Sequence, residues 1–107
     1  MRAKISGDGI FSFFDNNNFT HAAIYGLGVD GKILYDELKN HSIKIDYCID
    51  RNKNNIMINS PIYDLSDNLP DTEVIIVTPI IEFENIKAQL KQKTNAKIFS
   101  LEYVVNW

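Results

Sequence analysis

The sequence is poor in cysteine, and this scarcity excludes two kinds of site. Cys48 is the only cysteine among the 107 residues, so neither an internal disulfide nor a cysteine-based metal cluster can form. It stands within an apolar run, where we expect a small buried side chain, because free cysteine is among the most buried residue types. The two histidines, His21 and His41, are separated by a whole predicted helix, which does not favour a shared metal site.

Long apolar runs and an excess of positive charge are also lacking. No stretch reaches membrane-spanning length, and the N-terminus lacks the basic, apolar and small-residue order of a signal peptide. The 11 basic residues face 14 acidic ones, and this net charge of -3 indicates neither nucleic acid nor an anionic membrane as a partner. We therefore expect one small cytoplasmic domain without membrane insertion, long enough to bury a single core.

Glycine is scarce as well, with five in the chain, yet three of them stand close together. Gly26, Gly28 and Gly31 fit the pattern G-x-G-x-x-G between an apolar run and a helical pattern. In this pattern the first glycine permits a tight turn, the second lets the backbone approach a pyrophosphate, and the third lets the helix pack on the strand. A second apolar run follows and ends on Asp50, so residues 21–50 predict a nucleotide-binding βαβ unit.

The expected ligand of this unit is anionic. A helix that begins at the turn directs N–H groups and the positive end of its dipole at the turn, which favours a phosphate. Asp50 lies about twenty residues beyond the glycines, where a carboxylate can accept a hydrogen bond from a ribose 2′-hydroxyl. Arg51 follows directly and could accommodate a 2′-phosphate instead. The sequence therefore allows either a ribose 2′-hydroxyl or a 2′-phosphate in the ligand.

A ligand-free interpretation of the same turn is also open. Its glycines could serve tight packing alone, because glycine is used in turns and helix caps throughout globular proteins. Asp30 supports this alternative, since a carboxylate in the first helical turn suits the helix dipole and would repel a pyrophosphate. Lys32 could offset that charge.

Strand-like and helix-like patterns alternate along the chain, which predicts an α/β fold with a parallel sheet covered by helices. Strands are expected at residues 21–26, 43–50, 56–58, 73–78 and 96–101, and a helix at residues 32–39. A further helix is expected to begin at Thr78–Pro79, because threonine can cap a helix and proline fits the first turn. Its apolar face would consist of Ile80, Phe83, Ile86 and Leu90, and residues 102–107 would trail from the last strand.

The simplest arrangement is a three-layer, Rossmann-like open sheet of four to five strands in the order 3-2-1-4-5. Ligands of such sheets bind beyond the carboxyl ends of the strands, where the strand order reverses. The loops after the first and fourth strands should therefore be neighbours at one crevice. The candidate binding residues are Gly26, Leu27, Gly28, Val29, Gly31, Asp50, Arg51, Thr78 and Pro79.

Several segments together carry a resemblance to a family. The chain resembles the Rossmann-like domains of bacterial surface-polysaccharide biosynthesis proteins, over residues 20–105. It is similar to the nucleotide-sugar-binding N-terminal domains of sugar acetyltransferases and to the CoA-binding-like domains of nucleoside-diphosphate-sugar dehydratases and epimerases. The segments are AIYGLGVDGK, CIDRN, INSPIYDLSDNL, DTEVIIVTPIIEFENIKAQL and KIFSLEYVV.

The resemblance implies that a nucleotide contacts the three glycines of the turn and Asp50. The family's acetyltransferases usually have a histidine in the turn, where this chain has Val29 and Asp30. The chain also lacks the left-handed β-helix that transfers the acetyl group and the catalytic half of the epimerases and dehydratases. With no convincing nucleophile or acid–base pair of its own, the chain is not expected to be an independent enzyme.

Both ends are rich in apolar residues. Residues 1–20 are expected to form an N-terminal extension that packs on the domain of residues 21–107, with Ile10, Phe13 and Phe14 on one helical face. Together with Trp107 at the other end, they indicate a piece of a longer polypeptide or a homo-oligomer.

Three function classes follow. The first is a binding module for NAD or a nucleotide-sugar such as a UDP-sugar, associated with surface-polysaccharide biosynthesis. The second is a ligand-free interaction or scaffold domain of a larger glycan-biosynthesis protein. The third is an NAD-sensing regulatory domain, which shares the glycine turn and the strand-end acid but usually has a longer helix after the second strand.

Overall fold

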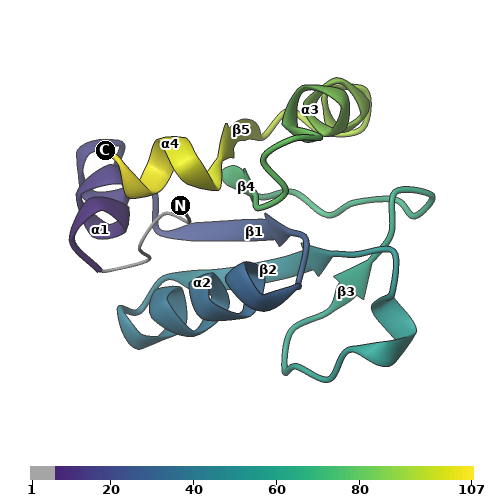
Figure 1. Cartoon of the computed structure of the whole chain (residues 1–107), viewed down its shortest axis with the longest axis horizontal. Coiled ribbons are helices and arrows are strands. Elements are labelled where there is room, and N and C mark those ends of the chain that lie inside the picture. Colours follow the sequence, from purple (N-terminus) through teal and green to yellow (C-terminus); the bar gives the residue numbers. More distant parts are fainter. Residues whose placement is uncertain (1–6) are drawn as a thin grey trace.

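A computed structural model describes residues 7–107, which form one parallel sheet flanked by helices (Figure 1). The five strands lie in the order β3-β2-β1-β4-β5, so the predicted fold class and strand order are confirmed. The strands are β1 (His21–Tyr25), β2 (Lys44–Ile49), β3 (Ile62–Tyr63), β4 (Val74–Val77) and β5 (Lys97–Ser100). The helices are α1 (Gly7–Asn16), α2 (Val29–Asn40), α3 (Phe83–Lys91) and α4 (Leu101–Val105), and a 3-10 turn, η1, spans Lys53–Asn55.

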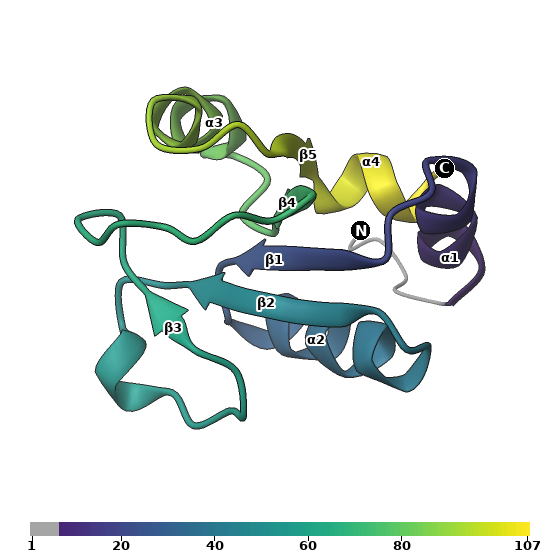
Figure 2. The same ribbon diagram turned by 180° about the vertical axis from the view of Figure 1, so that it is seen from behind.

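The two faces of the sheet bury separate layers of side chains. On one face, residues of α1, α2 and α4 pack against alternate strand residues such as Ile24, Cys48 and Ile76. On the other face, α3 packs through Ile86 and Leu90. Helix α2 lies in front of β2 in Figure 1 and behind it in Figure 2. All four residues of β4 are buried, as expected for a central strand covered on both sides.

Helix α1 covers one end of the first layer. Ile10, Phe13 and Phe14 are almost completely buried there, while residues 1–6 of the expected N-terminal extension lie outside the described residues. At Gly9 the helix passes so close to α4 that a built Cβ would lie 2.4 Å from the carbonyl oxygen of Val105. Both ends of the described chain are therefore part of the packed fold, and α1 and α4 lie side by side in both ribbon views.

A β-bulge interrupts the pairing of β1 with β2. Ala22 pairs with Ile45 and Ala23 pairs with Tyr47, which leaves Asp46 as the extra residue of β2. Bulges re-aim side chains, and here the residues on either side of Asp46 pack on opposite faces of the sheet. The Asp46 carboxylate contacts Nδ1 of His21 at the amino-terminal edge of the sheet.

The predicted third strand at residues 56–58 is wrong. The strand lies at Ile62–Tyr63, because the backbone of this segment completes the ladder of β2: the N–H of Cys48 donates to the carbonyl of Pro61 and the N–H of Asp50 to that of Tyr63, each at 2.9 Å. Ile56 and Ile58 instead pack beside the first layer as loop residues. A short apolar run does not reveal whether its residues pair in a strand or only pack as a loop.

Two expectations after β4 and β5 are also wrong. The helix expected from Thr78–Pro79 begins at Phe83, so Ile80 lies before it and is 48% exposed. The last expected strand ends at Ser100, and the chain then forms α4 instead of trailing away. Ser100 caps this helix, because its hydroxyl accepts a hydrogen bond from the N–H of Tyr103 at 3.1 Å.

Candidate functional site

The chain leaves β1 through a turn that only glycine fits. Gly26 has a φ of +92°, a backbone conformation that side chains with a Cβ rarely adopt. A built Cβ on Gly26 would lie 2.5 Å from Oγ1 of Thr78 and 3.0 Å from Cδ of Pro79. The N–H of Gly26 donates to the carbonyl of Ile49 at 2.8 Å, so the turn is also tied to the end of β2.

The other two glycines differ in what surrounds them. A Cβ on Gly31 would lie 1.9 Å from the carbonyl oxygen of Gly26, so α2 packs directly on the turn. Gly28 has nothing within 4 Å of a built Cβ, and it is the N-cap of α2. The third glycine therefore serves packing, and the second presents open backbone at the start of the helix.

The N-terminus of α2 is the electropositive part of the corner. The amides of the first helical turn, which begins at Val29, have no acceptor within the helix, and the first helical bond runs from the N–H of Lys32 to the carbonyl of Gly28 at 3.0 Å. The Asp30 carboxylate lies in the same turn and reduces the positive potential there. Val29 is 66% exposed, so its side chain lies at the lip of the corner.

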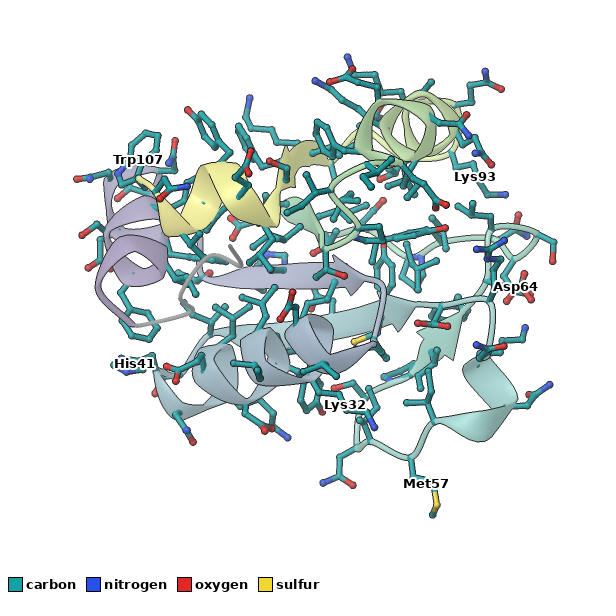
Figure 3. All side chains as sticks on the ribbon, in the orientation of Figure 1. Lys32, His41, Met57, Asp64, Lys93 and Trp107 are labelled. Carbon is teal, nitrogen blue, oxygen red and sulfur yellow. The ribbon has the colours of Figure 1, made fainter. Side chains whose placement is uncertain are left out.

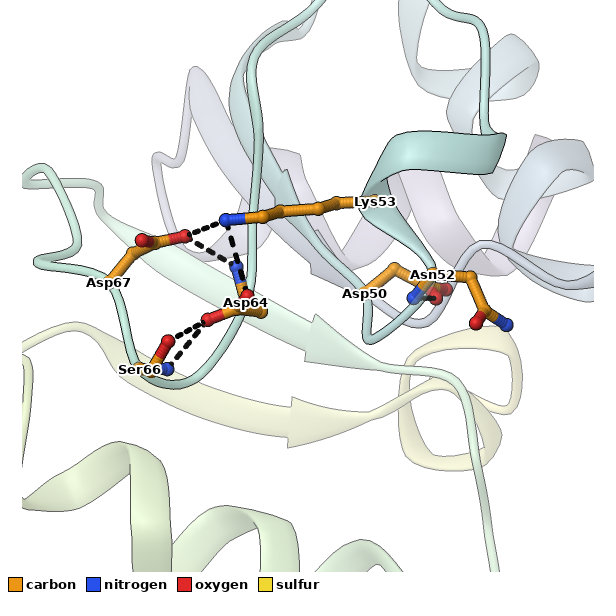
Figure 4. A network of polar contacts seen from close by, with 6 residues as sticks. All are labelled: Asp50, Asn52, Lys53, Asp64, Ser66 and Asp67. Atoms are coloured by element: carbon orange, nitrogen blue, oxygen red, sulfur yellow. Dashed lines mark hydrogen bonds and ion pairs between the residues drawn. The ribbon is translucent and has the colours of Figure 1, made fainter.

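Asp50 connects the glycine turn with the loop after β2. Its Oδ2 accepts the N–H of Leu27 at 2.7 Å. Its Oδ1 accepts the N–H of Asn52 at 2.8 Å, and Figure 4 shows this second bond. Each oxygen keeps a further lone pair, so a ribose hydroxyl could still donate to it. The side chain of Leu27 is buried in the core, and its contribution to the corner is the amide that Asp50 holds.

Thr78 supports the corner from β4. Its hydroxyl lies 3.0 Å from the carbonyl oxygens of both Tyr25 and Gly26, and its one proton is shared between them. Thr78 does not cap α3, because that helix begins five residues later, at Phe83. The predicted closeness of the loops after β1 and β4 is confirmed by these bonds, and Asp50 lies on the other side of the turn. Thr78 thus positions the turn, whereas Pro79 lines the hollow next to it.

A hollow of about 130 Å³ lies at this corner, between the carboxyl ends of β1, β2 and β4. It is lined by Tyr25, Gly26, Asp50, Arg51, Asn52, Pro79 and Glu82. Drug-sized ligands usually occupy about 300–1,000 Å³, so the hollow has room for part of a nucleotide and not for a whole one. Two acidic residues, Asp50 and Glu82, line it together with the basic Arg51.

Tyr25, Asn52 and Glu82 line the hollow but were not among the residues predicted from the sequence. Burial raises the pKa of the Tyr25 hydroxyl, and nearby Glu82 and Asp50 raise it further against the effect of Arg51. The phenol is therefore neutral at neutral pH. Tyr25 directly precedes the first glycine and Asn52 stands two residues after Asp50, so their closeness to the predicted site residues could have indicated them. Nothing in the sequence around the loop residue Glu82 indicates that it lines the hollow.

A second polar network stabilises the loops beside the hollow (Figure 4). The Lys53 Nζ lies 2.7 Å from Oδ2 of Asp67 and 3.2 Å from Oδ2 of Asp64, which joins the loop after β2 to the turn after β3. Hydrogen bonds from Ser66 and Lys53 lower the pKa of Asp64 to about 2. Lys53 offsets one of the two carboxylate charges, and the network stabilises the loop that carries Arg51 and Asn52.

The remaining reactive side chains lie elsewhere. Burial raises the pKa of the Cys48 thiol to about 12, so this cysteine is inert. His21 lies between Asp46 and Glu73 at the opposite edge of the sheet, and His41 stacks on Phe11 at the end of α2 (Figure 3). Within residues 7–107, no three histidine, cysteine or acidic side chains are placed to hold a metal ion.

Comparisons with protein-family models, with curated proteins and with solved structures gave no match. The resemblance to domains of surface-polysaccharide biosynthesis proteins therefore rests on the sequence segments alone. No helix within the described part of the chain is long and apolar enough to cross a membrane.

Proposed function

We propose that this chain is a nucleotide-binding module, with NAD or a nucleotide-sugar as its ligand and without catalysis of its own. The supporting observation is the open backbone at Gly28, which begins α2 at the point where the strand order reverses. Bare amides at a helix N-terminus suit a pyrophosphate, and the strand-end carboxylate of Asp50 suits a ribose hydroxyl. An association with surface-polysaccharide biosynthesis is part of the proposal and follows from the sequence resemblance.

The size of the hollow determines how such a ligand would lie. With about 130 Å³ available, the hollow would hold one ribose, and the rest of the nucleotide would extend over the exposed lip at Val29. Asp50 and Glu82 against Arg51 leave the lining of the hollow with one net negative charge, which disfavours a 2′-phosphate there. Among dinucleotides, NAD is therefore favoured over NADP.

A ligand-free scaffold domain is the second candidate. The Asp50 carboxylate already accepts hydrogen bonds from two backbone N–H groups, one of them in the glycine turn, so it has partners without a bound ligand. Asp30 in the first turn of α2 supplies negative charge where a phosphate would lie.

Calorimetry and thermal unfolding with NAD, NADP, UDP-sugars, ADP and CoA separate the two candidates. A ligand at a hundred times its dissociation constant stabilises the folded state by about 2.7 kcal/mol, which raises the melting temperature of a domain of this size by about 10 °C or more. A shift with NAD alone would favour the NAD-sensing regulatory function over nucleotide-sugar binding. If none of the five ligands changes the melting temperature or releases heat on mixing, the ligand-free scaffold is the function that is left.

The variant Gly28→Val tests the proposed position of the pyrophosphate. A Cβ at this position meets nothing within 4 Å, so the added side chain should occupy the open space above the turn and weaken binding at least about tenfold, while the unfolding temperature changes little. Met57→Ala is the matched control, because this side chain is 96% exposed and projects from a loop away from the corner (Figure 3). Unchanged affinity in Gly28→Val would refute the position.

A further inference from the structure

The open edge of the sheet at β5 combines unused backbone groups with exposed aromatic side chains. Lys97 donates its N–H to the carbonyl of Glu73 at 3.2 Å, so odd-numbered residues of β5 bond to β4. Since the bonding direction alternates along a strand, the N–H groups of Ile98 and Ser100 point to the outer edge. Within residues 7–107, no strand pairs with this edge.

A groove follows this edge between α3 and α4, which lie on either side of β5 in Figures 1 and 2. It has a volume of about 310 Å³ and is lined by Phe83, Lys87, Ile98, Phe99, Ser100 and Tyr103. Tyr103 stacks on Phe99 with 5.2 Å between the ring centroids and is 50% exposed, and Trp107 beside it is 45% exposed. Aromatic side chains next to an unpaired strand edge are typical of an interface that adds a strand.

The charges at the two ends of the edge are opposite. Lys97 begins β5 and points to the same face as Phe99, which is the α4 side, and Glu102 on α4 follows the end of the strand. About 10 Å of strand separate the two, and neither side chain forms an ion pair within the described part of the chain. An antiparallel copy of the same edge would bring each lysine next to the other copy's glutamate.

We propose that the chain forms a two-fold symmetric dimer in which the β5 strands of two copies pair antiparallel. The two-fold axis stands perpendicular to the sheet, so the α4 side of one copy continues into the α4 side of the other. Ile98 and Ser100 then donate their outer N–H groups across the interface, and Lys97 of each copy pairs with Glu102 of the other. The result is a continuous ten-stranded sheet, with the stacked Phe99 and Tyr103 rings of both copies near the axis.

Sedimentation velocity of the full chain over a range of concentrations tests the backbone pairing with two variants of one residue. Ser100→Pro removes the outer N–H, and the φ of -78° at this position suits proline. Ser100→Ala is the matched control, because it loses the same capping hydroxyl and keeps the N–H. Because symmetry doubles each lost bond, the dimer dissociation constant should rise at least about tenfold in Ser100→Pro and stay near wild type in Ser100→Ala.

Charge exchange tests the arrangement of the two copies. Lys97→Glu and Glu102→Lys should each weaken the dimer about tenfold, whereas the double variant should restore it, because the pair then forms with reversed signs. A monomer at all concentrations would overturn the proposal and would mean that the β5 edge does not pair with a second copy of the chain. A dimer that is indifferent to Ser100→Pro and to both single exchanges would overturn it as well.

Discussion

Replacing Gly31 by alanine should destabilise the fold although alanine is the better helix former. The new Cβ would lie 1.9 Å from the carbonyl oxygen of Gly26, where ordinary contact begins at 3.4 Å. That carbonyl belongs to a residue with a φ of +92° and accepts the Thr78 hydroxyl, so it cannot move freely. Overpacking of this kind costs about 1–3 kcal/mol, and the helix propensity of alanine returns at most about 1 kcal/mol.

The expected net loss is about 1–2 kcal/mol, which corresponds to a fall in melting temperature of roughly 5–15 °C. Thermal and urea unfolding followed by far-ultraviolet circular dichroism measure it. Gly28→Ala is the matched control, because it lies in the same turn with nothing within 4 Å of the new Cβ and with an extended backbone that alanine adopts. Equal stability of the two variants would refute the close packing of α2 on the turn.

Three further outcomes are expected. Gly9→Ala should separate α1 from α4 and cost about 1–3 kcal/mol in urea unfolding, since its Cβ would lie 2.4 Å from the Val105 carbonyl oxygen; an unchanged midpoint would contradict this contact. Thr78→Val should cost about 1 kcal/mol by removing the hydroxyl that donates to Tyr25 and Gly26, and a neutral result would show that the bond contributes nothing. Because the pKa of Asp64 is lowered from 3.8 to about 2, its contribution to stability is present well above pH 3.8 and is lost as the pH falls through about 2. Asp64→Asn should therefore be less stable than wild type at pH 6, with a gap that narrows as the pH falls and closes by about pH 1. A gap that persists at about pH 1 would contradict this cause.

The sequence determined the order of the strands and the position of the glycine corner. Local patterns sufficed here, because the positive φ of Gly26 and the close contact of Gly31, in the first turn of α2, with the Gly26 carbonyl both call for glycine at these positions. The buried run of β4 and the right-handed crossovers then left one simple arrangement of the sheet.

Only the tertiary structure decided which segments pair and which groups a side chain contacts. Residues 56–58 and Ile62–Tyr63 are both short apolar segments, and the free edge of β2 selected the second. Threonine is a residue type that often caps helices, yet the hydroxyl of Thr78 donates to the carbonyl groups of Tyr25 and Gly26 at the end of β1. Such choices depend on partners 13 residues away for β3 and more than fifty residues away for Thr78, which a local pattern does not contain.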